Sequence, residues 1–197
     1  WQTDSVDPLA SKQDFEDNTL VDATYDLAGK LWTVQRPTSS STSANFQLHE
    51  WVIQGDSLAP IRQFDLNPSP DISTSGASFS MSGQRLATYP TSMGVHEVCI
   101  WDVSTGTLVK CISTGPEPAE ILGVQLDIAA NRIATILRFD AQGALIARIQ
   151  DIASEQVIIQ VDAPTAISGD LQHAMLTDFG QTSIFDLGEQ WQSLYAE

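Results

Sequence analysis

The sequence predicts an all-β fold made of four similar units of antiparallel strands. Its apolar runs are short, rich in β-branched and aromatic residues, and bounded by Gly, Ser, Asn and Asp, as strands and their turns are. No long segment shows convincing 3.6-residue spacing of apolar side chains, the pattern that marks a helix. The same order of strands and turns recurs along the chain, and internal repeats of this kind decide the architecture. The best alternative for a helix is 144–154, which contains Ala and Leu but has only a weak apolar stripe.

The four units align with approximate boundaries at residues 18–68, 74–115, 120–162 and 163–197. Each unit opens with a short apolar strand and a polar turn. These turns read DLAGK from Asp26, SMSGQR from Ser80, DIAANR from Asp127 and SGDLQH from Ser168. A second strand follows, and it carries a threonine at a matching point, as Thr33, Thr88, Thr135 and, with a slip of one residue, Thr177.

The second half of each unit has its own signature. The third strand ends in a large residue, often an aspartate, and an aliphatic residue, most clearly in Trp101-Asp102-Val103 and Phe185-Asp186-Leu187. A tight turn follows, which reads QGDS, STG, ASE or GEQ. The fourth strand then closes the unit, as LAPIRQF, TLVKCI, QVIIQV or WQSLYA. Each unit is therefore predicted to be a four-stranded antiparallel sheet.

The second unit carries the most distinctive residues. They are Phe79-Ser80 with Ser82-Gly83, the strand Leu86-Ala87-Thr88, the run Ile100-Trp101-Asp102-Val103, and Thr105-Gly106. Together they resemble one blade of a WD-repeat β-propeller, although the glycine–histidine pair that often opens such a repeat is absent. The resemblance implies a β-propeller of about four blades. It also implies a non-catalytic protein–protein interaction or scaffold module.

Four blades are few for a ring of this kind. Propellers typically use about 4–8 blades, and WD-like blades resemble members of the wider rings. Because the edge strands of an open arc pair readily with other strands, we expect an incomplete propeller. Either the chain is the C-terminal part of a longer protein, or a second propeller segment on another chain completes the ring. Residues 1–17 are an acidic N-terminal segment or a strand of a preceding blade.

The charge of the chain restricts its partners. With 25 acidic and 9 basic residues, the formal net charge is −16. Bare nucleic acid and anionic membranes attract basic surfaces, so we expect neither as a direct partner. A basic protein partner fits, because complementary charge raises the rate and specificity of association. No stretch approaches the roughly 20 apolar residues of a membrane helix, and no signal-peptide pattern is visible, which favours a cytoplasmic location.

The chain has two cysteines, Cys99 and Cys111. A hairpin that turns at Ser104-Thr105-Gly106 places them opposite each other, with Cβ atoms about 4.5–5.5 Å apart. A cross-strand disulfide is therefore one alternative. We expect instead two buried, reduced thiols, because free cysteine behaves as a small buried hydrophobic residue.

Two short strings are similar to motifs of a serine hydrolase. Gly55-Asp56-Ser57-Leu58 resembles the nucleophile block of the GDSL (SGNH) esterases, and Asp170-Leu171-Gln172-His173 resembles their D-x-x-H block. This resemblance implies Ser57 as nucleophile, His173 as base and Asp170 as the residue that orients it. The blocks that build the oxyanion hole are not visible, and both strings fall on predicted hairpin turns of different blades. We therefore expect no catalytic residues.

The sequence also contains no cofactor motif, and its three histidines, His49, His96 and His173, lack the spacing of metal ligands. We expect neither a cofactor nor a metal. The predicted contact surface is the face that holds the loops between second and third strands. Its candidate partner-binding residues are Arg36, His96, Arg138, Asp140 and Asp178. A sensor or regulatory domain of a larger multidomain protein is the remaining alternative.

Overall fold

The computed structural model describes residues 18–37, 46–54, 57–66, 76–80, 82–90, 97–115, 119–127, 129–139, 145–162, 166–168, 171, 173–178 and 181–186. These residues form fifteen strands and no helix. Every strand pairing among them is antiparallel. The all-β prediction is therefore confirmed. A strand also occupies 145–151, where a helix was the alternative.

The strands form four sheets, which we call blades 1 to 4 in chain order. In each sheet the strands are hydrogen-bonded in sequence order, so each blade is a simple meander. Blade 1 contains β1 (Asn18–Tyr25), β2 (Leu31–Pro37), β3 (Phe46–Gln54) and β4 (Ser57–Leu66). Blade 2 contains β5 (Gly76–Phe79), β6 (Arg85–Tyr89), β7 (Glu97–Asp102) and β8 (Thr107–Ser113). Blade 3 contains β9 (Glu120–Leu126), β10 (Arg132–Arg138), β11 (Leu145–Asp151) and β12 (Val157–Asp162).

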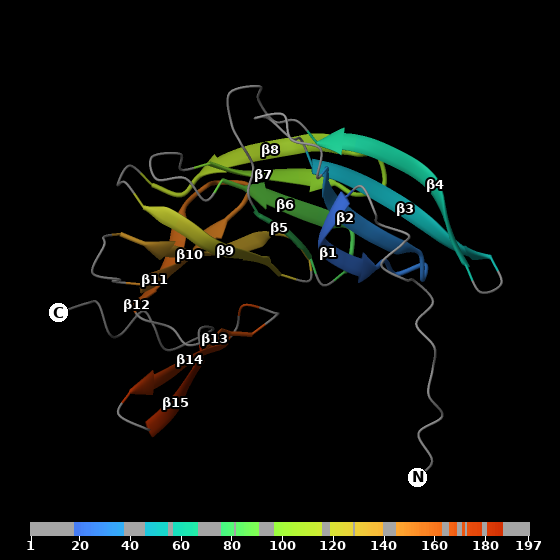
Figure 1. The fold of residues 1–197 in the computed structure, drawn as a ribbon. Coiled ribbons are helices and arrows are strands. Elements are labelled where there is room, and N and C mark those ends of the chain that lie inside the picture. The colour runs from blue at the N-terminus through green and yellow to red at the C-terminus, as the bar shows by residue number, and fades with distance from the viewer. Residues whose placement is uncertain are drawn as a thin grey trace, which may run out of the picture.

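Blade 4 contains β13 (Ala166–Ile167), β14 (His173–Asp178) and β15 (Gln181–Asp186). The fourth strand predicted for this blade, at 191–196, lies outside the described residues. The first strands of the blades are innermost: β5 packs against both β1 and β9. Successive sheets are thus stacked side by side around an axis, in the manner of propeller blades (Figure 1).

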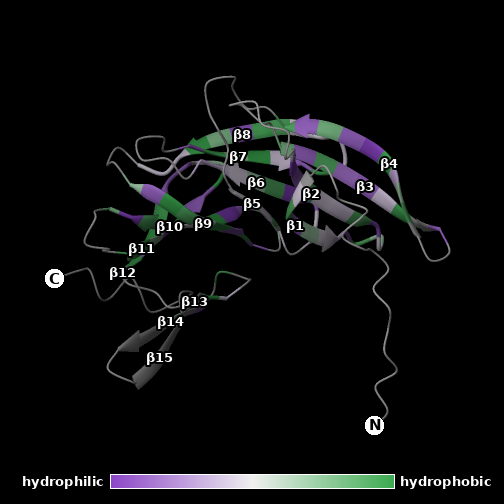
Figure 2. Ribbon diagram, viewed as in Figure 1, coloured by the Kyte–Doolittle hydropathy of each residue, from purple (hydrophilic) through white to green (hydrophobic). Residues whose placement is uncertain are grey.

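The blades are held together by apolar residues on both of their faces. We call the side that carries Thr33, Thr88 and Thr135 the leading face, which lies toward the preceding blade, and the opposite side the trailing face. The junction of blades 1 and 2 joins Trp32, Val34, Phe46, Leu48 and Leu66 to Phe79, Leu86, Cys99, Trp101 and Val103. The junction of blades 2 and 3 joins Ala87, Val98, Ile100 and Ile112 to Ala119, Ile121, Val124, Leu126, Ile133 and Leu137. Because blade 2 is covered on both faces, apolar side chains point to both sides of its strands. Figure 2 shows polar residues interspersed with them.

The recurring threonines have a defined partner in the first two blades. The indole Nε1 of Trp51 donates to Thr33 Oγ1 at 2.8 Å, and that of Trp101 donates to Thr88 Oγ1 at 2.9 Å. In blade 3 the tryptophan position is Gln150, whose amide donates across the junction to the carbonyl of Ser113 at 3.0 Å. Within the described residues this leaves the buried Thr135 hydroxyl without a hydrogen-bond partner.

The turns between first and second strands are closed by their opening side chain. Asp26 Oδ1 accepts the backbone N–H groups of Ala28 and Lys30, both at 2.9 Å. Asp127 Oδ1 accepts that of Asn131 at 2.8 Å, and Ser80 Oγ accepts that of Arg85 at 3.1 Å. Asp and Ser are suited to this role because their short side chains reach nearby backbone donors.

The fourth residue of each of these turns has a positive φ, which is 76° at Gly29, 68° at Gly83 and 53° at Ala130. Left-handed backbone strains any residue with a Cβ atom. We therefore expect Ala130→Gly to raise the free energy of unfolding by about 1 kcal/mol, measured by urea denaturation.

The reverse change at Gly83 is the matched control. A Cβ atom there would lie 2.9 Å from the backbone of Asp26, so Gly83→Ala should destabilise the protein. A loss of stability in Ala130→Gly would contradict the expectation.

The two cysteines form a disulfide, so the expectation of reduced thiols was wrong. Cys99 on β7 is directly paired with Cys111 on β8, and both side chains belong to the leading face of blade 2. The strand register alone brings the two sulfur atoms together. Both sulfur atoms remain within bonding distance although the two side chains pack at the blade junction.

Candidate interaction surface

Three of the five predicted contact residues lie within the described residues, and each belongs to the end of a second strand. Arg36 is near the end of β2, Arg138 ends β10 and Asp178 ends β14. The guanidinium of Arg36 lies 5.3 Å from the centre of the Phe46 ring, and Arg138 forms an ion pair with Glu120. Blade 2 lies between these two arginines, so the structure does not bring them together. His96 and Asp140 lie outside the described residues.

The residues proposed for a serine hydrolase belong to different sheets. Ser57 begins β4 in blade 1, and the exposed His173 begins β14 in blade 4. Asp170 lies outside the described residues. The described residues also lack the helices between parallel strands that the esterase fold requires.

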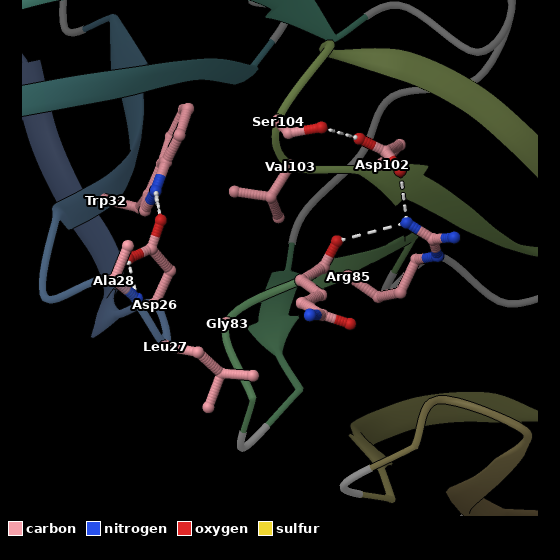
Figure 3. Close-up of a pocket in the computed structure, with 10 residues that line it drawn as sticks. Asp26, Leu27, Ala28, Trp32, Gly83, Arg85, Asp102, Val103 and Ser104 are labelled. Carbon is pink, nitrogen blue, oxygen red and sulfur yellow. Dashed lines mark hydrogen bonds and ion pairs between the residues drawn. The ribbon is translucent and has the colours of Figure 1, made fainter.

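One hollow lies at the junction of blades 1 and 2. It occupies about 440 Å³ on the end of the blades that holds the turns between first and second and between third and fourth strands. We call this end the turn face. Asp26 and Trp32 form one wall of the groove and Arg85, Asp102 and Ser104 the other, with Val103 between them (Figure 3). Leu27, which is 79% exposed, stands at its rim.

A second groove, of about 750 Å³, lies at the junction of blades 2 and 3 and has one wall in common with this arrangement. Its residues Ala130, Asn131, Arg132, Asp151, Ile152 and Ala153 correspond in the strand register to Gly83, Gln84, Arg85, Asp102, Val103 and Ser104 of the first groove. The remaining wall includes Val109, which is 50% exposed, and Lys110. Each groove thus combines an exposed aliphatic side chain with an arginine and an aspartate on adjacent strands.

A network of charges connects the two walls of the first groove. Glu50, 1% exposed, forms ion pairs with Lys30 at 2.7 Å and with Arg62. Arg62 lies over the Trp32 ring at 5.6 Å and donates to the carbonyl of Ser104 in blade 2 at 3.0 Å. The Ser104 hydroxyl donates to Asp102, which pairs with Arg85. These contacts couple blade 1 to blade 2 around the groove.

The outer strand of blade 2 makes an equivalent contact with blade 3. Lys110 Nζ donates to the carbonyls of Ile152 and Ala153, at 3.1 and 3.2 Å, and forms an ion pair with Glu155 at 2.8 Å. Lys110 is paired with Ile100 in the position where Arg62 is paired with Glu50. At each of these two junctions, a cation on the outer strand therefore binds backbone carbonyls of the following blade. In blade 3 the same position is Ile159, paired with Ile149.

The carboxylates of the turn face are held in their charged form. Burial raises the pKa of Asp102, but hydrogen bonds from Ser104 and Thr105 and the charge of Arg85 outweigh it and lower the pKa below its usual value. Burial likewise raises the pKa of Asp26. Hydrogen bonds from the backbone N–H groups of Lys30 and Ala28 and from the Trp32 indole outweigh this effect, so the pKa lies below its usual value. Both aspartates are therefore anions at neutral pH, and their charges are balanced by hydrogen bonds and basic side chains within the protein.

His49 is a buried titratable group outside this network. It stacks on Trp51 with 5.7 Å between ring centres and is 7% exposed, and its Nε2 has no hydrogen-bond partner among the described residues. Burial lowers its pKa below 6.5, although the carboxylate of Asp65 opposes this shift.

A pH-dependent loss of stability follows from His49. As the pH falls below 6.5, the unfolded chain takes up a proton at His49 before the folded chain does. We expect this to remove up to about 1.4 kcal/mol of stability per pH unit until the folded pKa is reached. His49→Gln should abolish this part of the pH profile in urea denaturation, whereas His173→Gln should retain it. Equal slopes in the wild type and His49→Gln would contradict the assignment.

The residues of the grooves were not among the predicted contact residues. Arg85 and Arg132 occupy the same position after successive turns, and that recurrence was visible in the sequence. The ion pairs of Lys30, Arg62 and Lys110 had no such signal, because their partners are 20, 12 and 45 residues away along the chain. The pairs of Lys30 and Arg62 depend on strand pairing within blade 1, and that of Lys110 depends on the packing of blade 2 against blade 3. In the described residues no group of His, Cys, Asp and Glu is placed to hold a metal ion, and no helix is long and apolar enough to cross a membrane.

No family model and no curated protein matches the chain. Many solved structures are similar in fold, and three of them are compared with the chain. The C-terminal WD40 domain of Sif2 matches 88% of this chain with a TM-score of 0.51 and 15% identity, and the match spans 47% of that domain's chain. A putative 6-phosphogluconolactonase from Bacteroides uniformis matches 80% with a TM-score of 0.52 and 10% identity, spanning 47% of its own chain.

Hydrazine synthase from Kuenenia stuttgartiensis matches 78% of this chain with a TM-score of 0.51 and 14% identity, spanning 42% of its own chain. The chain thus spans less than half the length of each of these structures. At these identities the similarity concerns the fold, and it confirms a β-propeller of about four blades.

Proposed function

We propose that the protein is a non-catalytic interaction module that binds a protein partner at the two grooves of its turn face. The observation that supports this proposal is a groove at each of two successive blade junctions, with one wall built from equivalent positions of the following blade. A ligand that bridges both grooves would meet a rigid frame, because the hydrogen bond from Arg62 to Ser104 and the ion pair of Lys110 with Glu155 connect the blades around them. Rigid grooves lower the entropic cost of binding.

The chemistry of the grooves points to an extended peptide segment with both apolar and basic residues. Leu27 and Val109 offer exposed aliphatic contacts at the rims, and apolar anchors of this kind supply much of the affinity of interfaces. Five basic side chains, Lys30, Arg62, Arg85, Lys110 and Arg138, are engaged in ion pairs within the fold. The net charge of −16 therefore acts at long range to attract a basic partner.

A displayed peptide library presented to the purified chain tests this proposal. We expect enrichment of peptides that combine aliphatic and basic residues, with an affinity that falls as salt is raised. Leu27→Asp should weaken binding of an enriched peptide at least tenfold in fluorescence anisotropy. Ile158→Asp, a matched change at an exposed position outside both grooves, should leave binding unchanged.

Two results would overturn the proposal. One is a library that yields no binder. The other is an enriched peptide whose binding survives Leu27→Asp but is lost in Arg36→Ala or Arg138→Ala. That second outcome would move the contact surface to the loop face predicted from the sequence.

The disulfide bears on the compartment in which this module works. Disulfides persist in oxidising compartments and are rare in the cytosol. The bond between Cys99 and Cys111 therefore supports an oxidising location over the cytoplasmic one expected from the sequence. Acid quenching and maleimide labelling of the native protein should detect no free thiol, and two free thiols would contradict this location.

A further inference from the structure

The leading face of blade 3 departs from the repeat at two positions of its third strand. Gln150 occupies the tryptophan position of blades 1 and 2. Arg148 occupies the position of Cys99 in blade 2, because Arg148 pairs with Thr135 as Cys99 pairs with Thr88. Two side chains that pack in the apolar core of the preceding junction are thus replaced by two polar ones.

A hollow of about 470 Å³ lies beside these two side chains, at the junction of blades 2 and 3. The end of blade 2 lines it with Ser113, Thr114 and Gly115, and blade 3 lines it with Arg148, Gln150, Glu155, Val157 and Gln160. None of these residues lines either groove of the turn face. The hollow is therefore a separate site, which we call the Arg148 hollow.

Gln150 presents a hydrogen-bond acceptor to the Arg148 hollow. Gln150 is 3% exposed, and its Nε2 donates to the carbonyls of Ser113 at 3.0 Å and Glu155 at 3.3 Å. These two bonds fix which end of the amide is the donor. Oε1 is buried and has no hydrogen-bond partner among the described residues. Because an unsatisfied buried acceptor is costly, a ligand that supplies an N–H or O–H group is favoured here.

Arg148 presents a donor and a positive charge to the same hollow. Its Nη1 donates to the carbonyl of Thr114, and its Nη2 donates to the side chain of Gln160 at 3.3 Å. Its Nε is buried and without a hydrogen-bond partner in the described part of the chain. The ion pairs of the described residues do not include Arg148. A partly buried guanidinium that lacks a counter-charge favours an anionic ligand.

The surroundings of Arg148 keep this charge unbalanced and accessible. Gly115 has a φ of 128°, and a Cβ atom there would overlap Nη1 of Arg148, so glycine leaves the room that the guanidinium needs. The carboxylate of Glu155 is already neutralised by Lys110 at 2.8 Å. Val157, which is 49% exposed, adds an aliphatic surface to the hollow.

We propose that the Arg148 hollow binds a carboxylate that carries an N–H group on its α carbon, the chemistry of an N-acylated amino acid and of a peptide C-terminus. The carboxylate accepts from Arg148 Nε, and the N–H donates to Gln150 Oε1. Residues two apart on a strand are about 7 Å apart, a span that this pair of ligand groups bridges with one hydrogen bond at each end. An aliphatic side chain of the ligand would contact Val157.

A titration of the intact chain with N-acetyl-leucine, followed by NMR of the backbone amides, tests the proposal. We expect saturable shifts around the hollow with a Kd of about 1 mM, the range for a ligand of about a dozen non-hydrogen atoms. N-acetyl-leucinamide lacks the carboxylate and 4-methylpentanoate lacks the N–H, so each should bind about fivefold more weakly or worse. A hexapeptide that ends in leucine distinguishes the two sources: a Kd at least tenfold lower assigns the site to a chain end, and an equal Kd assigns it to a small molecule.

Two variants connect the binding to the named atoms. Arg148→Lys keeps the charge but removes Nε, and Gln150→Met removes the acceptor at similar size. Each should weaken binding of N-acetyl-leucine about fivefold or more, with folding checked by circular dichroism. Gln47→Met, a matched change in blade 1, should leave the Kd unchanged. The comparison of the three small ligands on the wild type keeps the test decisive if a variant does not fold.

Three outcomes would overturn the proposal. The first is the absence of saturable shifts up to about 20 mM N-acetyl-leucine, well above the expected Kd. The second is equal binding of N-acetyl-leucine and its amide. The third is binding that both Arg148→Lys and Gln150→Met retain. Because the hollow shares no lining residue with the grooves, failure here and failure of the proposed function are distinguishable.

Discussion

Replacing Glu50 with glutamine is expected to lower the free energy of unfolding by about 2 kcal/mol. Glu50 is 1% exposed and neutralises both Lys30 and Arg62. Without its charge, the half-exposed Lys30 and Arg62 lose the counter-charge between them, and Arg62 also loses the contact that positions it for blade 2. Glutamine keeps the size of the side chain, so the change isolates the charge. Urea denaturation at pH 7 measures the effect.

The matched control is Asp65→Asn, which removes an exposed carboxylate on the adjacent strand and should change stability by less than about 0.5 kcal/mol. If Glu50→Gln is equally mild, the network does not stabilise the junction. The equivalent residues Ile100 and Ile149 show that the position can be apolar. Replacing Glu50 and Arg62 together with apolar residues should therefore cost less than Glu50→Gln.

The same carboxylate predicts a response to acid. Burial raises the pKa of Glu50, but Lys30 and Arg62 outweigh it and lower the pKa below 4.5. A depressed carboxylate pKa stabilises the folded chain above its unfolded value, and this stability is lost as the pH falls through the folded pKa. The acid limb of the wild-type profile should thus be steeper than that of Glu50→Gln.

Reduction of the disulfide is expected to lower the free energy of unfolding by about 3 kcal/mol. The bond joins residues separated by 12 positions, and closing a loop of this size restricts the unfolded chain. Urea denaturation with and without a phosphine reductant measures the difference. The double variant Cys99→Ala/Cys111→Ala should show a similar loss and no further response to the reductant. A wild type that the reductant leaves unchanged would show that the bond does not contribute.

The position of the disulfide sharpens this test. Cys99 packs in the junction of blades 1 and 2 with Leu86 and Trp101. Reduction should therefore raise hydrogen exchange in β7 and β8 more than in β11 and β12 of blade 3, which lie beyond the next junction. Equal changes in both blades would mean that the bond acts only on the unfolded chain.

Features that depend on contacts between residues close together in the sequence were predictable, and features that depend on contacts between distant residues were not. The first-to-second-strand turns were visible because Asp26, Ser80 and Asp127 act on backbone groups within five residues. The strands were visible because β-branched and aromatic residues fit a pleated sheet covered on both faces. The pairing of Cys99 with Cys111 was foreseen as an alternative, since the hairpin turn sets the register. The disulfide itself was not expected, because packing alone does not distinguish a thiol from a bonded sulfur.

The sequence by itself therefore determined the repeating four-stranded unit and its turns, because each depends on contacts between neighbours in the chain. Only the tertiary structure decided which charges meet between blades, as Lys110 reaches Glu155 in the next blade. It also placed the grooves at the blade junctions and Arg148 beside Thr114 of the preceding blade. These features arise from the stacking of whole sheets, and that geometry is set by the summed packing of many side chains rather than by any local pattern.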